Sequence, residues 1–515
     1  MPVARRLGAI ARDPTTLAVA GCAVVYVLTL YPGVGGVINH GDSAKFQFLG
    51  VIGGVSHPPG NPLYLCIDVA LSALPLPWAP STVVSALSAI FGLLALVMVG
   101  RITTLLVARP LPAVVAIVAV GLGPLFWTLA TEAEVYTLHA TIVTVAVWLG
   151  CRYALGHGDR WLAWAGFAAT VGLANHLTIV TIAPALAWLT WHQLRRSGAR
   201  AAGRTMLGVL GGLAVAALVY VYVPLRVQAG APYTELHDAL SPASLWAYVS
   251  AREFHHSFGI PSLAVLATER FPATVERLRQ QWLWPVWLAV PWGLSAIARR
   301  SPRAAVFLGV AIAGQLVFPL MYEIEDPAGF YVPIVVLMGV AIGAVVAAPA
   351  RALGRALATT LLLLALVPLA QIHWTEARTV APFDRVEDID DLRWTAWDLP
   401  DAVERMPEHA RLLAPCGHYG CAQVLNYYRF ADARFREKDL EIVHALGRPE
   451  GWHAVWPQLD REGAATAPVC AIAPSDVRVM RGWNLAAQPI ERGVLEWGGK
   501  SYARPPLWCT SAPSP

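Results

Sequence analysis

A short polar stretch behind the first long apolar run contains residue types that can carry out acid–base chemistry. Residues 39–46 include Asp42 and Lys45, and residues 56–62 place His57 in the sequence Ser-His-Pro-Pro-Gly-Asn-Pro. A carboxylate at a membrane surface can act as a general base or bind a cation. The structural alternatives are a helix N-cap for Asp42 and an ordinary loop histidine for His57. We interpret this stretch as half of an active site that faces away from the cytoplasm.

Further candidates lie at the ends of later apolar runs. Glu134 stands where one run ends and the next begins, and His176 follows an asparagine at a helix junction. Arg226 ends another run, and its planar guanidinium matches the geometry of phosphate oxygens. The structural alternatives are a solvated carboxylate, a hydrogen-bonded histidine and an arginine that reaches the interface. The last candidate site residues are Tyr322, Asp326 and Tyr331. Their structural alternative is a proline-assisted turn.

The elements that must position these residues are membrane helices. The chain of 515 residues is 56% hydrophobic and 14% charged, whereas soluble proteins carry roughly 25% charged residues. A spanning helix needs about 20 apolar residues. The long apolar runs therefore predict an all-α polytopic membrane protein with eleven spans. These are residues 15–32, 81–107, 111–130, 134–154, 161–176, 178–194, 205–224, 282–298, 304–322, 328–348 and 356–373.

The basic residues set the predicted orientation, because cytoplasmic loops are rich in lysine and arginine. The arginine clusters fall on one side if the N-terminus is inside and residues 63–76 form an interfacial helix that does not cross. These clusters lie at residues 5–12, 101–109, 152–160, 195–204, 299–303 and 351–355. We therefore expect the N-terminus inside, the C-terminus outside and a first span that acts as a signal anchor.

Two domains are predicted. Residues 1–374 form the membrane domain, with outer loops at 33–80 and 225–281 and an amphipathic helix near 242–254. Residues 375–515 form an exported α/β domain, with strands at 410–415, 441–445 and 468–473 and helices at 419–431 and 451–459. Export would permit disulfides, and three pairings stay open for Cys416, Cys421, Cys470 and Cys509.

The sequence contains no phosphate-binding glycine loop, no dinucleotide fingerprint and no Cys/His zinc spacing. No cofactor is therefore expected. A divalent metal is compatible with the sequence but not indicated by it, and no nucleic acid is expected as a partner. A substrate that reaches an outer-facing membrane site from within the bilayer is a lipid, and the carboxylate and basic residues together favour a lipid-phosphate-linked donor.

Five blocks of the chain carry a family resemblance. They are Gly41-Asp42-Ser43 with the His-Pro-Pro-Gly-Asn-Pro-Leu-Tyr sequence at 57–64, then residues 131–136, 172–178, 222–226 and 326–333. In this order they resemble the GT-C membrane glycosyltransferases. More narrowly, they resemble bacterial proteins related to the animal O-mannosyltransferase that modifies IPT domains of plexins and related receptors. The resemblance covers residues 15 to 340.

The resemblance implies an inverting transfer of a mannose-like sugar from polyprenyl phosphate to a hydroxyl of a protein or glycolipid acceptor. The reaction would take place on the outer face of the bacterial inner membrane. Asp42 would activate the acceptor with His57 beside it, and Arg226 would help hold the donor phosphate. Many relatives have a glutamate where this chain has Lys45, so a second carboxylate is lost and a phosphate contact could be gained. Residues 375–515 would recognise the acceptor.

Two other functions fit the composition. A transporter or lipid flippase usually places ionisable groups near the middle of the bilayer, whereas the polar residues here crowd one face. A non-catalytic membrane scaffold is the second alternative. The argument against it is the expected clustering of Asp42, His57, Glu134 and Arg226.

Overall fold

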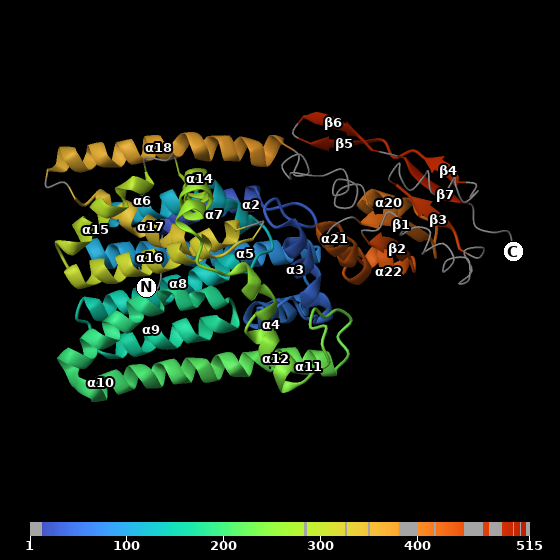
Figure 1. Cartoon of the computed structure of the whole chain (residues 1–515). Coiled ribbons are helices and arrows are strands. Elements are labelled where there is room, and N and C mark those ends of the chain that lie inside the picture. Colours follow the sequence, from blue (N-terminus) through green and yellow to red (C-terminus); the bar gives the residue numbers. More distant parts are fainter. Residues whose placement is uncertain are drawn as a thin grey trace, which may run out of the picture. The chain divides into compact units, whose positions relative to one another are not determined.

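The structure is a computed structural model of the chain (Figure 1). It describes residues 13–282, 286–324, 327–348, 351–380, 399–416, 419–446, 467–472, 487–497, 499–504 and 506–510. The chain divides into two compact units. The helical unit comprises Met1–Leu30, Gly53–Asp68 and Ala86–Trp374, and the mixed unit comprises Tyr31–Ile52, Val69–Ser85 and Thr375–Pro515. The predicted first outer loop is therefore shared between the two units.

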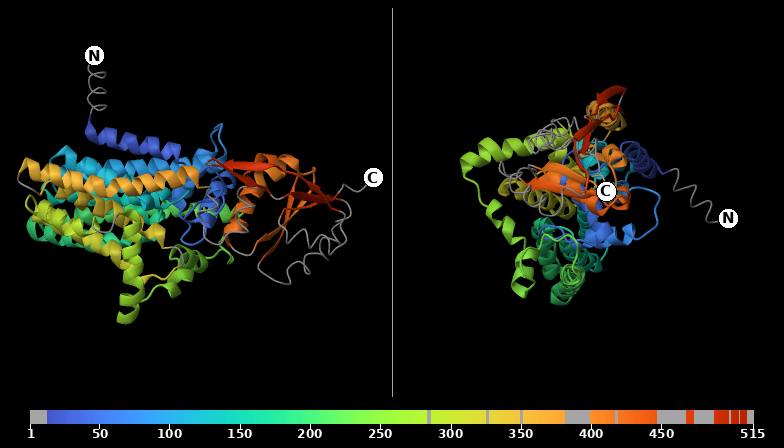
Figure 2. Two further views of the ribbon diagram at one scale, coloured as in Figure 1. Left: turned by 90° about the horizontal axis from the view of Figure 1, so that it is seen from above. Right: turned by 90° about the vertical axis from the view of Figure 1, so that its right-hand side faces the viewer.

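The helical unit contains long helices that run side by side (Figures 1 and 2). They are α2 (Pro14–Leu28), α5 (Pro80–Val107), α6 (Pro110–Gly121), α7 (Pro124–Thr131), α8 (Tyr136–Ala154), α9 (Arg160–Val171), α10 (Ala183–Tyr220), α15 (Val290–Ala298), α16 (Pro302–Met321), α17 (Val332–Val345) and α18 (Ala352–Thr379). Several begin with proline, whose fixed φ suits the first helical turn. Asp13 and Ser301 cap α2 and α16 through their side chains.

Short elements connect and cover these helices. They are α4 (Pro62–Ser72), η1 (Gly172–Ala174), η2 (Leu177–Ile182), α11 (Tyr222–Gln228), α12 (Pro242–Val249), η3 (Arg252–Ser257), α13 (Leu263–Val265), η4 (Leu266–Arg270), α14 (Phe271–Gln281), η5 (Trp287–Ala289) and η6 (Ala328–Tyr331). The expected interfacial helix at 63–76 corresponds to α4. The helix expected near 242–254 corresponds to α12, which ends at Val249.

Helix α17 is buried in the helical unit, whereas α10 and α18 are exposed. Helix α17 is buried along its length, and the backbone of α6 approaches it closely. A Cβ atom at Gly343 would lie 2.4 Å from the carbonyl oxygen of Pro112, so only glycine fits there. Helices α10 and α18, at opposite edges of the helical unit in Figure 1, expose leucines such as Leu207 and Leu353. Apolar side chains that face outward on long apolar helices indicate contact with lipid.

The spans differ in length from the prediction. In the described residues five helices are long and apolar enough to cross a membrane, or six if the bent pair α6 and α7 is one span. Each of the eleven predicted spans overlaps a helix, but α2 and α9 have only 15 and 12 residues. The runs at 178–194 and 205–224 lie in the two halves of α10, which are separated by a break at Gly198 (φ 78°), and across this break Oγ1 of Thr205 donates to Oε1 of Gln193 at 2.7 Å. A multi-pass membrane protein follows from these helices, and the number of eleven spans stays a prediction.

The mixed unit combines helices with a five-stranded sheet. Its helices are α3 (His40–Ile52), α20 (Leu399–Arg405), α21 (Tyr419–Phe430) and α22 (Ala433–Glu437). The strands are β1 (Arg411–Cys416), β2 (Glu441–Leu446), β3 (Val469–Ala471), β4 (Ala487–Ile490), β5 (Val494–Trp497), β6 (Lys500–Ala503) and β7 (Leu507–Thr510). The sheet order is β2-β1-β3-β7-β4, and β5 pairs with β6.

Three of the strands and one helix of this unit follow the sequence prediction. Strands β1, β2 and β3 are parallel neighbours, and α21 coincides with the helix predicted at 419–431. Strands β7 and β4 add an antiparallel edge that the sequence pattern did not reveal. The helix predicted at 451–459 lies outside the described residues.

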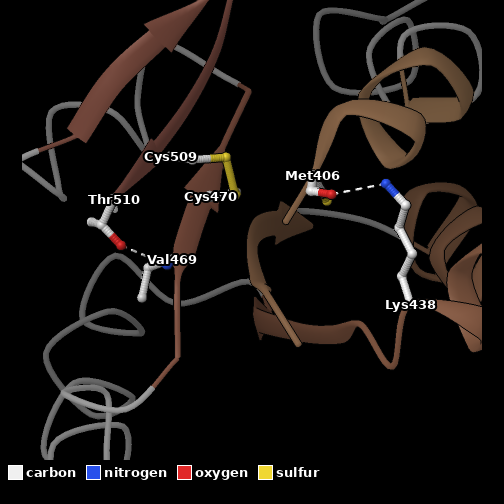
Figure 3. The surroundings of a disulfide bond; sticks show 6 residues. All are labelled: Met406, Lys438, Val469, Cys470, Cys509 and Thr510. Carbon is white, nitrogen blue, oxygen red and sulfur yellow. Dashed lines mark hydrogen bonds between the residues drawn. A yellow bond between two sulfur atoms is a disulfide. The ribbon is translucent and has the colours of Figure 1, made fainter. Parts of the chain in front are cut away.

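A disulfide joins two strands of the sheet. Cys470 on β3 and Cys509 on β7 face each other in the antiparallel register and are covalently linked (Figure 3). Beside them, the backbone N–H of Val469 donates to Oγ1 of Thr510 at 2.9 Å. Cys421 is also disulfide-bonded. Of the three pairings left open by the sequence, the one observed for Cys470 is therefore with Cys509.

Candidate active site

Asp42 lies in the first turn of α3, in the mixed unit. The backbone N–H of Ser43 already donates to the carbonyl of Asn39 at 2.8 Å, so the helix has begun before Asp42. The N-cap alternative for Asp42 is therefore wrong, because the residue is inside the helix. A carboxylate in a first turn is stabilised by the positive end of the helix dipole.

Asp42, Lys45 and Tyr419 form a group of hydrogen-bonded side chains. The Lys45 ammonium lies 2.9 Å from Oδ1 of Asp42 and donates to the Tyr419 hydroxyl at 2.7 Å. The Tyr419 hydroxyl lies 3.2 Å from the same Oδ1. The side chain of Asp42 is 23% exposed, whereas that of Lys45 is 0% exposed. The carboxylate is thus the member of the pair that an acceptor hydroxyl can approach.

In the helical unit, the loop that carries His57 is fastened through its backbone carbonyl groups. Arg226 on α11 donates from Nε to the carbonyl of Gly53 at 2.6 Å, and the Tyr222 hydroxyl donates to Gly54 at 2.7 Å. The Tyr248 hydroxyl donates to the carbonyl of Ser56. Burial raises the pKa of Tyr248 well above its ordinary value, so this donor stays protonated. The phosphate contact expected for Arg226 stays a prediction.

The blocks that contain His57 and His176 come together within the helical unit. The amide of Asn61 donates to the carbonyl of Asn175 at 2.6 Å, and Asn175 donates to the carbonyl of Val135 at 3.3 Å. His57 is close enough to His176 for their charges to interact. Blocks far apart in the sequence, at 57–64, 131–136 and 172–178, therefore form one polar region.

His176 belongs to a chain of hydrogen bonds. Its Nδ1 lies 2.7 Å from Oγ1 of Thr178 and accepts the backbone N–H of Thr178 at 3.3 Å. Oγ1 of Thr178 lies 3.0 Å from Nε2 of His139. Because Nδ1 of His176 accepts a backbone donor, the proton of the neutral ring is on Nε2. The hydrogen-bonded histidine anticipated as the structural alternative is observed, and it does not exclude a substrate contact through Nε2.

Glu134 is 1% exposed and precedes α8. Its backbone N–H donates to Oγ of Ser88 at 2.9 Å, and Ser88 donates back to its carbonyl at 3.0 Å. The Tyr64 hydroxyl lies 3.5 Å from the same Ser88 oxygen. The solvated-carboxylate alternative is therefore wrong, since the side chain is buried.

The tyrosines near the end of α16 divide between two environments. Tyr322 stacks on Phe318, with ring centroids 5.0 Å apart, and meets Phe330 edge-on at 5.4 Å. Phe330 also contacts the ring of His176, at 5.7 Å between centroids. Tyr331 is buried, and its hydroxyl lies 2.9 Å from Oγ1 of Thr274. Tyr322 thus borders the His176 region through Phe330, and Asp326 lies outside the described residues.

The described candidates therefore form two sets, each within its own unit. Asp42 and Lys45 belong to the mixed unit, and the others belong to the helical unit: His57, Glu134, His176, Arg226, Tyr322 and Tyr331. Within the described ranges, no three His, Cys, Asp or Glu side chains gather as a metal-binding group. Sequence reasoning missed Tyr419, because nothing local connects it to a residue that stands 377 positions earlier.

Two solved structures are similar to this chain in fold. ArnT from Cupriavidus metallidurans bound to undecaprenyl phosphate aligns with a TM-score of 0.59 at 12% identity, covering 96% of this chain and 97% of that chain. Its apo structure aligns with a TM-score of 0.55 at 13% identity, with the same coverage. At these identities the likeness shows the fold alone, which is similar to that of the two ArnT structures.

The family resemblance is more specific. Residues 42–198 match the family described as the Protein O-mannosyl-transferase TMEM260 N-terminal domain. A Protein O-mannosyl-transferase tmem260 from Dictyostelium discoideum is 25% identical over 188 residues, which are 33% of this chain and 22% of that protein. The matched segment thus spans about a fifth of the relative's length. The predicted resemblance to the O-mannosyltransferase family is confirmed.

Proposed function

We propose that this protein is an integral membrane glycosyltransferase that moves a mannose-like sugar from a polyprenyl-phosphate donor to an acceptor hydroxyl. The match of residues 42–198 to the O-mannosyl-transferase domain carries the proposal, because it begins at Asp42 and includes His57, Glu134 and His176. The fold shared with an ArnT structure bound to undecaprenyl phosphate supports a donor of this class.

In the proposed reaction the acceptor oxygen attacks the anomeric carbon and forms the new C–O bond as the bond to the donor phosphate breaks. The phosphate leaves with the electron pair, and the acceptor proton passes to Asp42 as the general base. Attack opposite to the leaving group inverts the anomeric configuration. Glu134 is the second candidate for the base, since it is a buried carboxylate in the matched segment.

The donor would be held by basic, imidazole and aromatic side chains. We assign the phosphate to Arg226, whose planar guanidinium suits an anion that gains charge in the transition state. His57, His176 and Tyr322 border the same polar and aromatic region and would contact the sugar. Lys45, Asp326 and Tyr331 complete the set assigned to substrate binding. No metal or cofactor is required in this proposal.

The proposed topology has eleven spans, the N-terminus inside and the C-terminal domain outside the bacterial inner membrane. The disulfide between Cys470 and Cys509 supports export of the mixed unit, because such bonds persist in oxidising compartments. The acceptor would be a protein or a glycolipid, and the name of the Dictyostelium relative favours a protein.

The test is transfer of radiolabelled sugar from polyprenyl-phosphate donors in membranes that contain the wild type, Asp42→Asn or Glu134→Gln. We expect Asp42→Asn, at equal protein level, to lower the rate by on the order of 10²–10⁴-fold, the usual contribution of a general base. Equal rates for Asp42→Asn and the wild type would overturn Asp42 as the base and leave Glu134. No transfer by the wild type from any donor would overturn the glycosyltransferase proposal.

A further inference from the structure

We propose that Tyr419 is a positioning residue for Asp42, so that the C-terminal part of the chain completes the catalytic base. The inference rests on the proposed function, since it takes proton transfer at Asp42 as given. It assigns to this part of the chain a role in the chemical step, in addition to any role in binding the acceptor.

The first support is the close approach of two helix N-termini within the mixed unit. A Cβ atom at Gly41 would lie 2.6 Å from the Tyr419 ring and 3.2 Å from Cα of Gly420. The first turns of α3 and α21 therefore approach each other closely where both carry a glycine, Gly41 and Gly420. The positive ends of both helix dipoles lie beside Asp42, and both favour a carboxylate over a neutral acid.

The second support is the direction of the hydrogen bonds. An ammonium group has only donors, so the 2.7 Å contact makes the Tyr419 hydroxyl the acceptor of a Lys45 proton. The single proton of that hydroxyl is then directed to Oδ1 of Asp42 at 3.2 Å. Oδ1 thus receives donors from Lys45 and from Tyr419. The bond from Tyr419 adds a donor from a second helix to the one from the helix that carries Asp42, and this second direction restricts the rotation of the carboxylate.

The third support is that α21 has other anchors in the mixed unit. The ring of Phe430 lies 5.7 Å from that of Phe48 on α3. The Tyr427 hydroxyl lies 3.4 Å from both the backbone nitrogen and Oγ of Ser81. The Tyr419 side chain is 46% exposed, so its hydroxyl is not required to fill the core. Its removal therefore tests the link to Asp42 and leaves the docking of α21 in place.

The experiment compares Tyr419→Phe with Tyr427→Phe in the full-length protein. Both variants delete one hydroxyl from the same helix, but only Tyr419 contacts Asp42. We expect Tyr419→Phe to lower kcat roughly tenfold, which is the effect of losing one hydrogen bond to a charged group. Its donor KM and its melting temperature should equal those of the Tyr427→Phe control. Tyr427→Phe should keep the wild-type kcat.

A second variant changes the same contact at its α3 side. Gly41→Ala must displace the Tyr419 ring, so it should also lower kcat, and the double variant Gly41→Ala/Tyr419→Phe should be no slower than the slower single variant. Additive losses, or equal kcat values for Tyr419→Phe and Tyr427→Phe, would overturn the positioning role. So would a loss of kcat that follows a fall in melting temperature. A wild type without transfer activity would instead overturn the proposed function itself.

Discussion

The two sets of candidate residues differ in what holds them. In the mixed unit, Asp42, Lys45 and Tyr419 are bonded to one another through side chains. In the helical unit, Arg226 and Asn61 are bonded to backbone carbonyl groups of other segments, although His176 and Tyr331 also pair with threonine hydroxyls. Side chains bonded to the backbone fix the course of a loop, whereas side chains bonded to each other fix charge and proton positions. The first set is therefore expected to control the chemical step and the second to shape the binding region.

The largest effect is expected where α3 meets α21. Phe48 is fully buried and packs against Phe430, so Phe48→Ala should destabilise the mixed unit by about 3–5 kcal/mol through the cavity that it leaves. Transfer activity should fall with it, because Asp42 is carried by the same helix. The measurements are the melting temperature in detergent and the transfer rate. Trp78→Ala, at a 63% exposed position of this unit, is the control. An unchanged melting temperature for Phe48→Ala would contradict the role of this contact.

The disulfide should contribute to the stability of the mixed unit and not to that of the helical unit. Replacing Cys470 and Cys509 by serine should cost about 2–4 kcal/mol of stability, because the bond closes a loop between residues 39 positions apart. Hydrogen exchange should quicken in β3 and β7 and stay unchanged in α17. Cys66→Ser, at a free cysteine, should change neither. Faster exchange in α17 of the serine variant would show that the units do not respond separately.

Arg226→Lys separates loop shaping from phosphate binding. Lysine keeps the charge but lacks the Nε donor to Gly53, so we expect a loss of about 1–3 kcal/mol in stability. If Arg226 also binds the donor phosphate, the donor KM should rise several-fold. Arg252→Lys, at an exposed position of η3, serves as the control. A variant with unchanged donor KM and lowered stability would assign Arg226 to loop shaping alone.

The smallest effect is expected at Tyr248. Tyr248→Phe removes the donor to the carbonyl of Ser56 and should cost about 1 kcal/mol. Exchange of the backbone amides in residues 53–61 should quicken while kcat stays within twofold. A tenfold fall in kcat for Tyr248→Phe without faster exchange would show that the helical-unit contacts act on the chemical step. The two sets of residues would then not differ in the way described above.

The sequence predicted the parts of the fold that have local signatures. Apolar runs located every long helix, and short apolar stretches located β1, β2 and β3. The pattern also separated the two halves of α10, because the chain leaves the helical conformation at Gly198, between the runs predicted at 178–194 and 205–224. Strands β4 and β7 are short, and their pairing depends on a partner elsewhere in the sheet. Such pairing is a tertiary effect that local propensity does not encode.

The candidate site was predictable to a similar extent. His57 was found because its block combines proline, asparagine and histidine, and His176 was found because it follows an asparagine at a helix junction. The structure brings the two blocks together. Tyr419 was not found, since a tyrosine at a helix start has no distinctive local context. Only the folded contact between α3 and α21 shows that it reaches Asp42.

The segment that matches the O-mannosyl-transferase family begins within α3, yet the residues that cover α3 include α21, far beyond the end of that segment. Phe46, Phe48 and Leu49 are fully buried. A protein cut at the limits of the matched segment would expose them to solvent. The segment that matches the family and the part of the chain that folds as one compact unit therefore have different limits. A graft of residues 42–198 onto another C-terminal domain would succeed only if that domain supplied a matching apolar helix.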